Sequence, residues 1–474
     1  MAGDRSTAAL RVGSRRLKGR RRSSRRIKGA VDLISSLPDV ILQDILTFVP
    51  TKLAIRTSLL SKRWRHVWCN ISSLSFDYDR LDQAYSISET LTHYTALKMM
   101  KFHLHTTSFI GICKWIKFVM SRNVEKISLD LTEYNFPDFF YINTSVKKLS
   151  IRLSISATIP PRCSVSWTSL QKLYLRHCFF TDESIAKILS GCPILESLKL
   201  DFYSELRILD LSKSMRLRTL EINESASGFG PTQIVAPYLH CLVLTSTKSS
   251  LFTLVDVSSL AEAKLTICIS PFQYNIEADI LQNMVLKLLK ELQNVEKLTF
   301  EEILLQVLSL AELLGVPLPM FKVKALTLKT SISRNVIIGI ERILQNSPDL
   351  KTLTKVKLDE YVASQGLNPD QCWRSKDGAN WNRSRWKVKP KHVVSFMRLM
   401  LKNTKKLEKM VVLLEEYPYS TFRRLIPNLA HGYNRNLKVF FFLNRLQIYS
   451  SRFDFFLNQL EPDKIGLLKL KLPS

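Results

Sequence analysis

A short apolar pattern recurs along most of the chain and constrains its fold more than any other feature. The template is apolar-x-x-apolar-x-apolar, which predicts a short strand with one buried face. Its copies are NVEKISL (123–129), SVKKLSI (145–151), SLQKLYL (169–175), ILESLKL (194–200), RLRTLEI (216–222), YLHCLVL (238–244), NVEKLTF (294–300) and the shorter VKALTL (323–328). The first six recur every ~21–25 residues, a period typical of solenoids, in which stacked units bury one another's faces.

The segment Leu170–Leu200, LQKLYLRHCFFTDESIAKILSGCPILESLKL, is the most complete copy of this unit. Its pattern positions, L-x-x-L-x-L-x-x-C, are Leu170, Leu173, Leu175 and Cys178. The stretch TDESIAKIL then predicts a helix capped by Thr181 or Asp182, and SGCP ends that helix. Cys178 and Cys192 are interpreted as small buried side chains, because their spacing suits no zinc module.

Before the repeats, the sequence predicts three short helices at about 39–48, 52–60 and 61–68. Pro38 and Asp39 start the first helix, since proline suits a first turn and an acid suits the positive helix end. Its apolar residues cover two faces, Ile41/Ile45/Phe48 and Leu42/Leu46/Val49. About forty residues cannot bury that much apolar surface alone. The pattern favours docking to a partner protein over binding to a membrane or to nucleic acid.

The stretch LPDVILQDILTFVPTKLAIRTSLLSKRWRHVW (37–68) closely resembles the F-box of plant F-box/leucine-rich-repeat proteins. The resemblance implies binding to a Skp-type adaptor, and through it to the cullin and RING subunits of a ubiquitin ligase. Carried over by position, the adaptor-binding residues are Leu37, Pro38, Ile41, Leu42, Ile45, Leu46, Leu53, Ala54, Leu60, Ser61, Lys62, Trp64 and Trp68. Some of these must pack inside the helical unit instead, and the sequence does not divide the two groups. Lys62, Arg63 and Arg65 are interpreted as flanking charges that steer an acidic partner.

The repeats resemble the leucine-rich repeats of the same proteins, and the region Gln345–Glu415 resembles, in interrupted form, their C-terminal FBD-type segment. The segment 361–390 breaks the repeat pattern and is rich in tryptophan and basic residues. It is either an ordered insertion packed on the array or a loop that recognises the target. In the second case the target-binding residues are Trp373, Trp381, Arg383, Arg385 and Trp386.

These patterns predict an α/β fold in which a three-helix F-box precedes a leucine-rich-repeat solenoid, a right-handed β-α superhelix. The expected parts are a disordered basic arm (1–30), the F-box (31–75), leucine-rich repeats (76–344) and C-terminal repeats with the FBD-like region (345–474).

The arm contains the stretch RRLKGRRRSSRRIKG (15–29), which has too few apolar residues to offset the entropy of ordering. It is open to three interpretations: a solvated tail, an arm for nuclear import or polyanion binding, or an organellar transit peptide. The last is disfavoured because no amphipathic pattern is visible. We expect the protein in the nucleus, the cytoplasm or both.

Several classes of function find no support in the sequence. No uncharged apolar run approaches the ~20 residues of a membrane helix, so we expect no membrane partner. The chain has only 14 glycines and no Walker loop, H-E-x-x-H, G-x-S-x-G or Cys/His cluster, so we expect neither an enzyme nor any cofactor or metal. The eight cysteines are scattered and are interpreted as reduced thiols.

Two functional hypotheses remain. In the first, the chain is the substrate-recognition subunit of a Skp–cullin–F-box ubiquitin ligase and binds an unidentified protein target through its repeats, with nucleic acid not expected as a partner. In the second, it is a repeat scaffold or inhibitor with a non-functional F-box, binding acidic partners or nucleic acid. Lysine and arginine at outward positions of the repeat strands underlie that last alternative.

Overall fold

The structure is a computed structural model that describes residues 34, 36–78, 84–132, 134–153, 163–202, 206–224, 233–246, 253–267, 278–330, 334–356, 397–414 and 437–443. In these residues, fourteen strands form one parallel sheet and three short strands form a second. The basic arm and the segment 361–390, with its five expected target-binding residues, lie outside the described residues.

The main sheet is built in chain order, one strand for each repeat unit. Its strands are β1 (Ser73–Tyr78), β2 (Lys101–Thr106), β3 (Lys126–Leu131), β4 (Lys148–Leu153), β5 (Lys172–Cys178), β6 (Ser197–Phe202), β8 (Thr219–Glu224), β10 (Cys241–Ser246), β12 (Glu262–Ile267), β13 (Lys297–Glu301), β14 (Ala325–Lys329), β15 (Thr352–Val356), β16 (Lys409–Leu414) and β17 (Lys438–Leu443). Every copy of the repeat template contributes to one of these strands, so the predicted α/β solenoid is confirmed.

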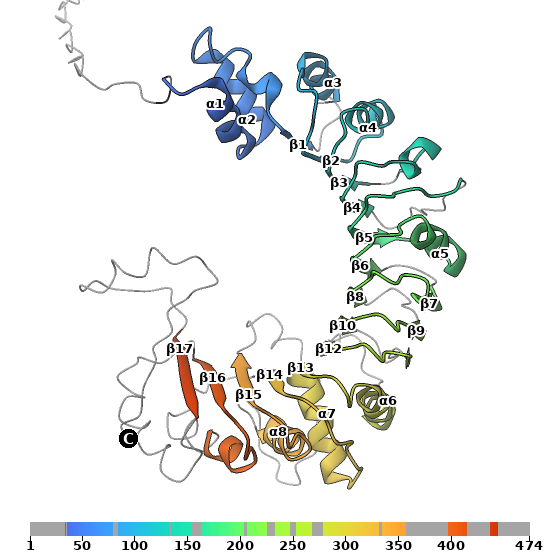
Figure 1. The fold of residues 1–474 in the computed structure, drawn as a ribbon, viewed down its shortest axis with the longest axis vertical. Coiled ribbons are helices and arrows are strands. Elements are labelled where there is room, and N and C mark those ends of the chain that lie inside the picture. Colours follow the sequence, from blue (N-terminus) through green and yellow to red (C-terminus); the bar gives the residue numbers. More distant parts are fainter. Residues whose placement is uncertain are drawn as a thin grey trace, which may run out of the picture.

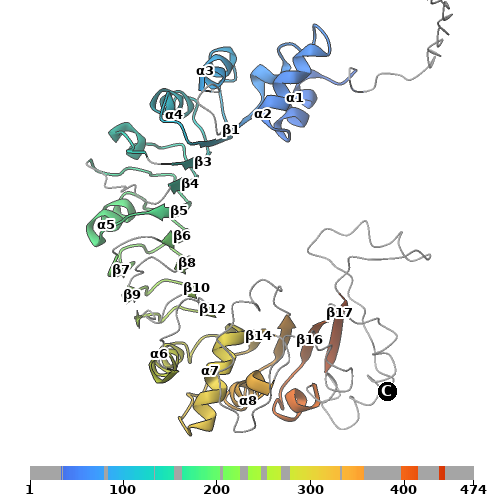
Figure 2. The ribbon, with the colours of Figure 1, turned by 180° about the vertical axis from the view of Figure 1, so that it is seen from behind.

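The sheet curves, and its strands line the inner side of the curve (Figure 1). Helices α3 (Ala84–His93), α4 (Ile112–Met120), α5 (Asp182–Ser190) and α6 (Ala278–Glu291) follow the outer rim in both views (Figure 2). Between α5 and α6 the outer side instead carries the second sheet, β7 (Ile208–Asp210), β9 (Gln233–Val235) and β11 (Thr253–Val255). No helix in the described part of the chain is long and apolar enough to cross a membrane.

The core lies between the strands and the outer elements, where alternate strand residues point. Leu173, Leu175 and Cys178 of β5 are almost fully buried, as the template predicts. Thr181 caps α5 by accepting a hydrogen bond from the Ser184 backbone N–H at 3.2 Å, and Ser184 bonds back to it as a capping box. Cys192 is also buried, and that burial raises the pKa of its thiol to about 12.

Helices α7 (Glu302–Leu313) and α8 (Arg334–Gln345) pack closely because Gly339 of α8 has no side chain. Its backbone N–H donates to the Ser309 hydroxyl at 2.7 Å, and a Cβ at this position would lie 2.1 Å from the Leu305 carbonyl oxygen.

We therefore expect Gly339→Ala to lower the free energy of unfolding by about 2 kcal/mol. Helix propensity alone would raise the free energy of unfolding, since alanine in a helix is favoured over glycine by about 1 kcal/mol. Overpacking costs about 1–3 kcal/mol, and here the blocked atoms belong to backbone that cannot rotate away. Urea unfolding of wild type and the Gly339→Ala variant measures this change in the free energy of unfolding. A variant more stable than wild type would contradict the observed packing.

The N-terminal unit contains α1 (Asp39–Thr47), α2 (Thr51–Arg56), a 3-10 turn at Thr57–Leu59 and another at Val67–Asn70. The predicted third α-helix over 61–68 is wrong, because residues 62–66 form turns. Tertiary contacts override the helical pattern, since Arg63 is held at the start of α1 while Trp64 and Trp68 both enter the core. An eight-residue helix has too few internal hydrogen bonds to resist such contacts.

Candidate functional site

The start of α1 is fixed by a charged contact from a distant residue. Pro38 precedes the helix with a backbone φ of −57°, and Asp39 lies in its first turn. Arg63 donates two hydrogen bonds to Asp39 Oδ1, at 2.8 and 3.0 Å, and another to the Leu37 carbonyl oxygen. Arg63 thus holds the start of α1 through these bonds, although its side chain is exposed like those of its neighbours Lys62 and Arg65.

One face of α1 packs inward and divides the predicted adaptor-binding residues into two groups. Leu42 and Leu46 lie four residues apart and are 0% and 4% exposed, as one stripe of a helix requires. The predicted residues that are buried are Leu42, Leu46, Ala54, Trp64 and Trp68. Leu37 is half-buried. The exposed ones are Pro38, Ile41, Ile45, Leu53, Leu60, Ser61 and Lys62. The buried group supports the surface of the unit, and only the exposed group is placed to meet a partner.

The same unit also carries a concentration of exposed apolar side chains. Among the described residues, nineteen large hydrophobic side chains are exposed, and eight of them fall between positions 34 and 60, which makes this unit the main apolar concentration on the surface. They are Ile34, Val40, Ile41, Ile45, Phe48, Leu53, Leu59 and Leu60. Phe48 and Leu59 are the most exposed, at 89% and 85%. We call these eight residues the apolar face.

Four residues of the apolar face were not among the predicted adaptor-binding residues: Ile34, Val40, Phe48 and Leu59. A signal for two of them was present in the sequence. Val40 and Phe48 lie on the same side of a 3.6-residue helix as Ile41 and Ile45, so placing α1 on a helical wheel groups them.

The helical unit is joined to the first repeat by hydrogen bonds and by a shared core. Thr51 at the start of α2 is buried, and its hydroxyl accepts a hydrogen bond from the Ser75 backbone N–H in β1 at 2.7 Å. Tyr94 after α3 donates from its hydroxyl to the Ile71 carbonyl at 2.6 Å, and burial raises the pKa of Tyr94 to about 12. The unit therefore also caps the open end of the array, a role that terminal units of solenoids commonly have.

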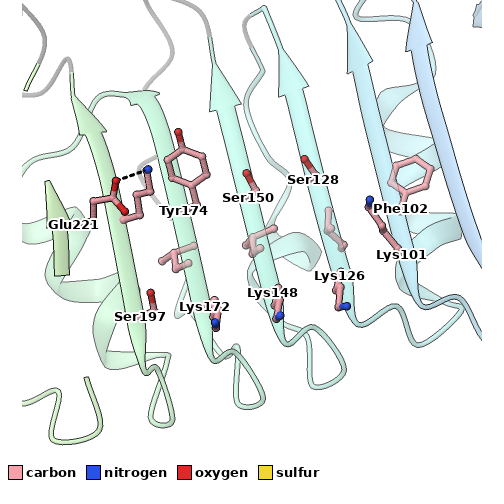
Figure 3. A pocket seen from close by; sticks show the side chains of 14 residues that line it. Lys101, Phe102, Lys126, Ser128, Lys148, Ser150, Lys172, Tyr174, Ser197 and Glu221 are labelled. Carbon is pink, nitrogen blue, oxygen red and sulfur yellow. Dashed lines mark hydrogen bonds and ion pairs between the residues drawn. The ribbon is translucent and has the colours of Figure 1, made fainter. Parts of the chain in front are cut away.

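The inner surface of the array is a second candidate site, because its strands place polar side chains toward the open side of the curve. A shallow groove of about 320 Å³ crosses β2 to β8 there, lined by lysine side chains at the strand starts and by serine side chains further along the strands (Figure 3). In the described part of the chain no group of three or more His, Cys, Asp or Glu side chains is arranged to hold a metal ion.

Comparison with known proteins agrees with both halves of this architecture. Residues 34–76 match the family model of the F-box domain, and residues 91–330 match a model described as At1g61320/AtMIF1, LRR domain. The chain is 55% identical to the putative F-box/LRR-repeat protein At3g18150 of Arabidopsis thaliana, an alignment that covers 93% of this chain and 99% of that protein. This chain belongs to the plant F-box/leucine-rich-repeat family.

Two further members of the family from the same plant are similar over most of their length. The F-box/LRR-repeat protein At3g03360 is 48% identical to this chain, in an alignment that covers 86% of this chain and 90% of that protein. The F-box/LRR-repeat protein At5g02910 is 49% identical to this chain, in an alignment that covers 82% of this chain and 89% of that protein. An F-box joined to leucine-rich repeats supports a substrate-adaptor role in general, and the F-box implies a Skp-type adaptor as its partner in general.

Proposed function

We propose that this F-box/leucine-rich-repeat protein is the substrate-recognition subunit of a Skp–cullin–F-box ubiquitin ligase. The observation that carries the proposal is the apolar face, which none of the described elements covers. Exposed apolar side chains concentrated on a small helical unit are typical of a protein-docking site. Its position on the F-box makes the Skp-type adaptor the expected occupant, and cullin and RING subunits would join through that adaptor.

The most exposed side chains of the apolar face can contribute substantially to binding. Burying one fully exposed leucine or phenylalanine side chain contributes about 1.5–3 kcal/mol. Phe48, Leu59 and Leu60 are each at least 68% exposed, so all three can gain a large part of that amount on contact. Binding also has entropic costs, which leaves the most exposed residues as the expected hot spots.

The arrangement of the two sites suits a receptor. The F-box lies at one end of the array, and the inner side of the curve is open along the strands (Figure 1). Adaptor and target can therefore be bound at the same time without competing for one surface. Holding a target near the ubiquitin-conjugating enzyme raises the effective concentration of its lysines, and no active site in this chain is needed for that. We propose that this occurs in the nucleus, the cytoplasm or both.

The proposal is tested by titrating the full chain with a Skp-type adaptor. We expect wild type to bind, and Leu53→Ala with Leu60→Ala to weaken binding about tenfold or more, because both side chains are exposed on the apolar face and lose contact area. The matched control is Leu97→Ala with Met215→Ala, which trims side chains that are 86% and 66% exposed elsewhere on the molecule and should leave the affinity unchanged. A wild-type protein that does not bind the adaptor would instead support the scaffold hypothesis with an idle F-box.

A further inference from the structure

Four lysines form a row across the inner surface of the array, one at the start of each of four neighbouring strands. Lys101, Lys126, Lys148 and Lys172 are the first residues of β2, β3, β4 and β5, and the strand register places each directly beside the next. All four side chains are exposed, and Figure 3 shows Lys126, Lys148 and Lys172 side by side at the same level of the sheet. Adjacent strands lie ~4.8 Å apart, so the row extends over about 14 Å.

This arrangement is unfavourable for the free protein. Like charges directly opposite one another on neighbouring strands destabilise a sheet. Within the described residues, none of the four lysines has an ion pair with an acid, although other lysines of the array do. The row thus concentrates positive charge that no ion pair within the described residues compensates.

The acids closest to the row are already neutralised by other residues. Glu125, which precedes Lys126, pairs with Lys98 at 2.9 Å and Lys147 at 3.2 Å, and these two partners hold the pKa of its carboxyl below the usual value. Further along the strands, Asp130 pairs with Arg152 at 3.1 Å. The lysine row is therefore left for an external anion.

Hydroxyl groups lie beside the lysines in the same groove. Ser128 and Ser150 face the groove two residues after Lys126 and Lys148, and the register sets them side by side. Both are half-buried, and each can donate one hydrogen bond to an oxygen anion. Lysine ammonium groups and serine hydroxyls together suit carboxylate oxygens.

We propose that this row binds an acidic, extended segment of a target protein, laid across β2 to β5 with its carboxylates on the four lysines. The inference deepens the proposed receptor function and rests on it, since it assigns the target-binding surface of the repeats. The charges are spread one per strand and do not converge on one point, which matches a run of single carboxylates. An extended segment advances ~3.3 Å per residue with successive side chains on opposite faces, so about five residues span the row and about three of their carboxylates face the lysines.

One feature favours a protein over a single-stranded nucleic acid. Strand-binding proteins stack bases on exposed aromatic rings. Among the residues that line the groove, Phe102 is fully buried, and Tyr174 is half-buried with Lys199 Nζ over its ring, 5.1 Å from the ring centroid.

The test measures binding of the full chain to a fluorescent deca-glutamate peptide and to a ten-nucleotide oligodeoxythymidylate in physiological salt. The variant carries Lys101→Gln, Lys126→Gln, Lys148→Gln and Lys172→Gln. The control carries the same charge change at Lys114, Lys117, Lys287 and Lys290, which are exposed on α4 and α6 of the outer rim. We expect the row variant to bind the peptide about thirtyfold more weakly, from the sum of the exposed ion pairs along the row, and the control to bind within twofold of wild type.

A second readout follows from the repulsion within the row. The row variant should melt at the same temperature as wild type or higher, because it removes like charges that face one another. Equal peptide affinity in variant and wild type, an equal loss in the control, or tighter binding of the oligonucleotide than of the peptide would each overturn the proposal. Adaptor affinity, measured in parallel, should be the same for all these proteins, so a failure here is distinguishable from a failure of the receptor function.

Discussion

Replacing Ile45 and Phe48 with aspartate should weaken binding of the Skp-type adaptor more than a hundredfold while the protein stays folded. Both side chains are exposed in the free protein, at 46% and 89%, so the carboxylates remain hydrated and cost little stability. In the complex they would enter an apolar contact, where burying an unpaired charge is far more costly than losing a methyl group. Two such charges exceed the ~3 kcal/mol that corresponds to a hundredfold change.

The matched control for this variant is Met215→Asp with Leu314→Asp, at residues that are 66% and 57% exposed elsewhere on the molecule. It adds the same charge and should not change adaptor affinity. Isothermal titration gives the affinities, and the thermal unfolding midpoint shows whether each variant is folded. If the double aspartate variant binds like wild type, the apolar face is not the adaptor site. If its unfolding midpoint falls sharply, these side chains contribute to the core.

The repeat array could be predicted from the sequence because its signal is local. In each template the alternating apolar residues mark the buried side of a strand, and the polar residues between them mark the inner surface. Even the lysine row is visible in this way, since Lys126, Lys148 and Lys172 occupy the same position of NVEKISL, SVKKLSI and SLQKLYL. The register of the sheet then turns a repeated sequence position into a row in space.

The F-box surface could be predicted only in part, because its division into core and contact residues depends on tertiary packing. The apolar residues of α1 cover two faces, and composition does not say which face turns inward. Leu42 and Leu46 do so because α2 and the turn at Val67–Asn70 lie against that side. The second sheet was likewise not predicted, since its strands of three residues are too short for a periodic signal.

Trp68→Ala should destabilise the N-terminal unit by about 4 kcal/mol, with loss of adaptor binding only as a consequence. Sequence similarity places Trp68 among the adaptor-binding residues, yet its side chain is 6% exposed and belongs to the core shared by α1 and the first repeat. Replacing a buried tryptophan with alanine costs about 3–5 kcal/mol, because the cavity adds to the lost burial. Trp68→Phe keeps much of the volume and should cost clearly less.

Hydrogen exchange measured by mass spectrometry can localise this effect. We expect faster exchange in α1 and β1 of the Trp68→Ala protein, because Trp68 supports the cap of the array, and unchanged protection in α7 and α8, which are many repeats away. Saturating adaptor should restore the protection, since a ligand that binds only the folded unit stabilises it. Unchanged exchange together with a large loss of adaptor affinity would show instead that Trp68 contacts the adaptor directly. That outcome would require the N-terminal unit to open on binding, since only such a change could expose a tryptophan that the free protein keeps inside.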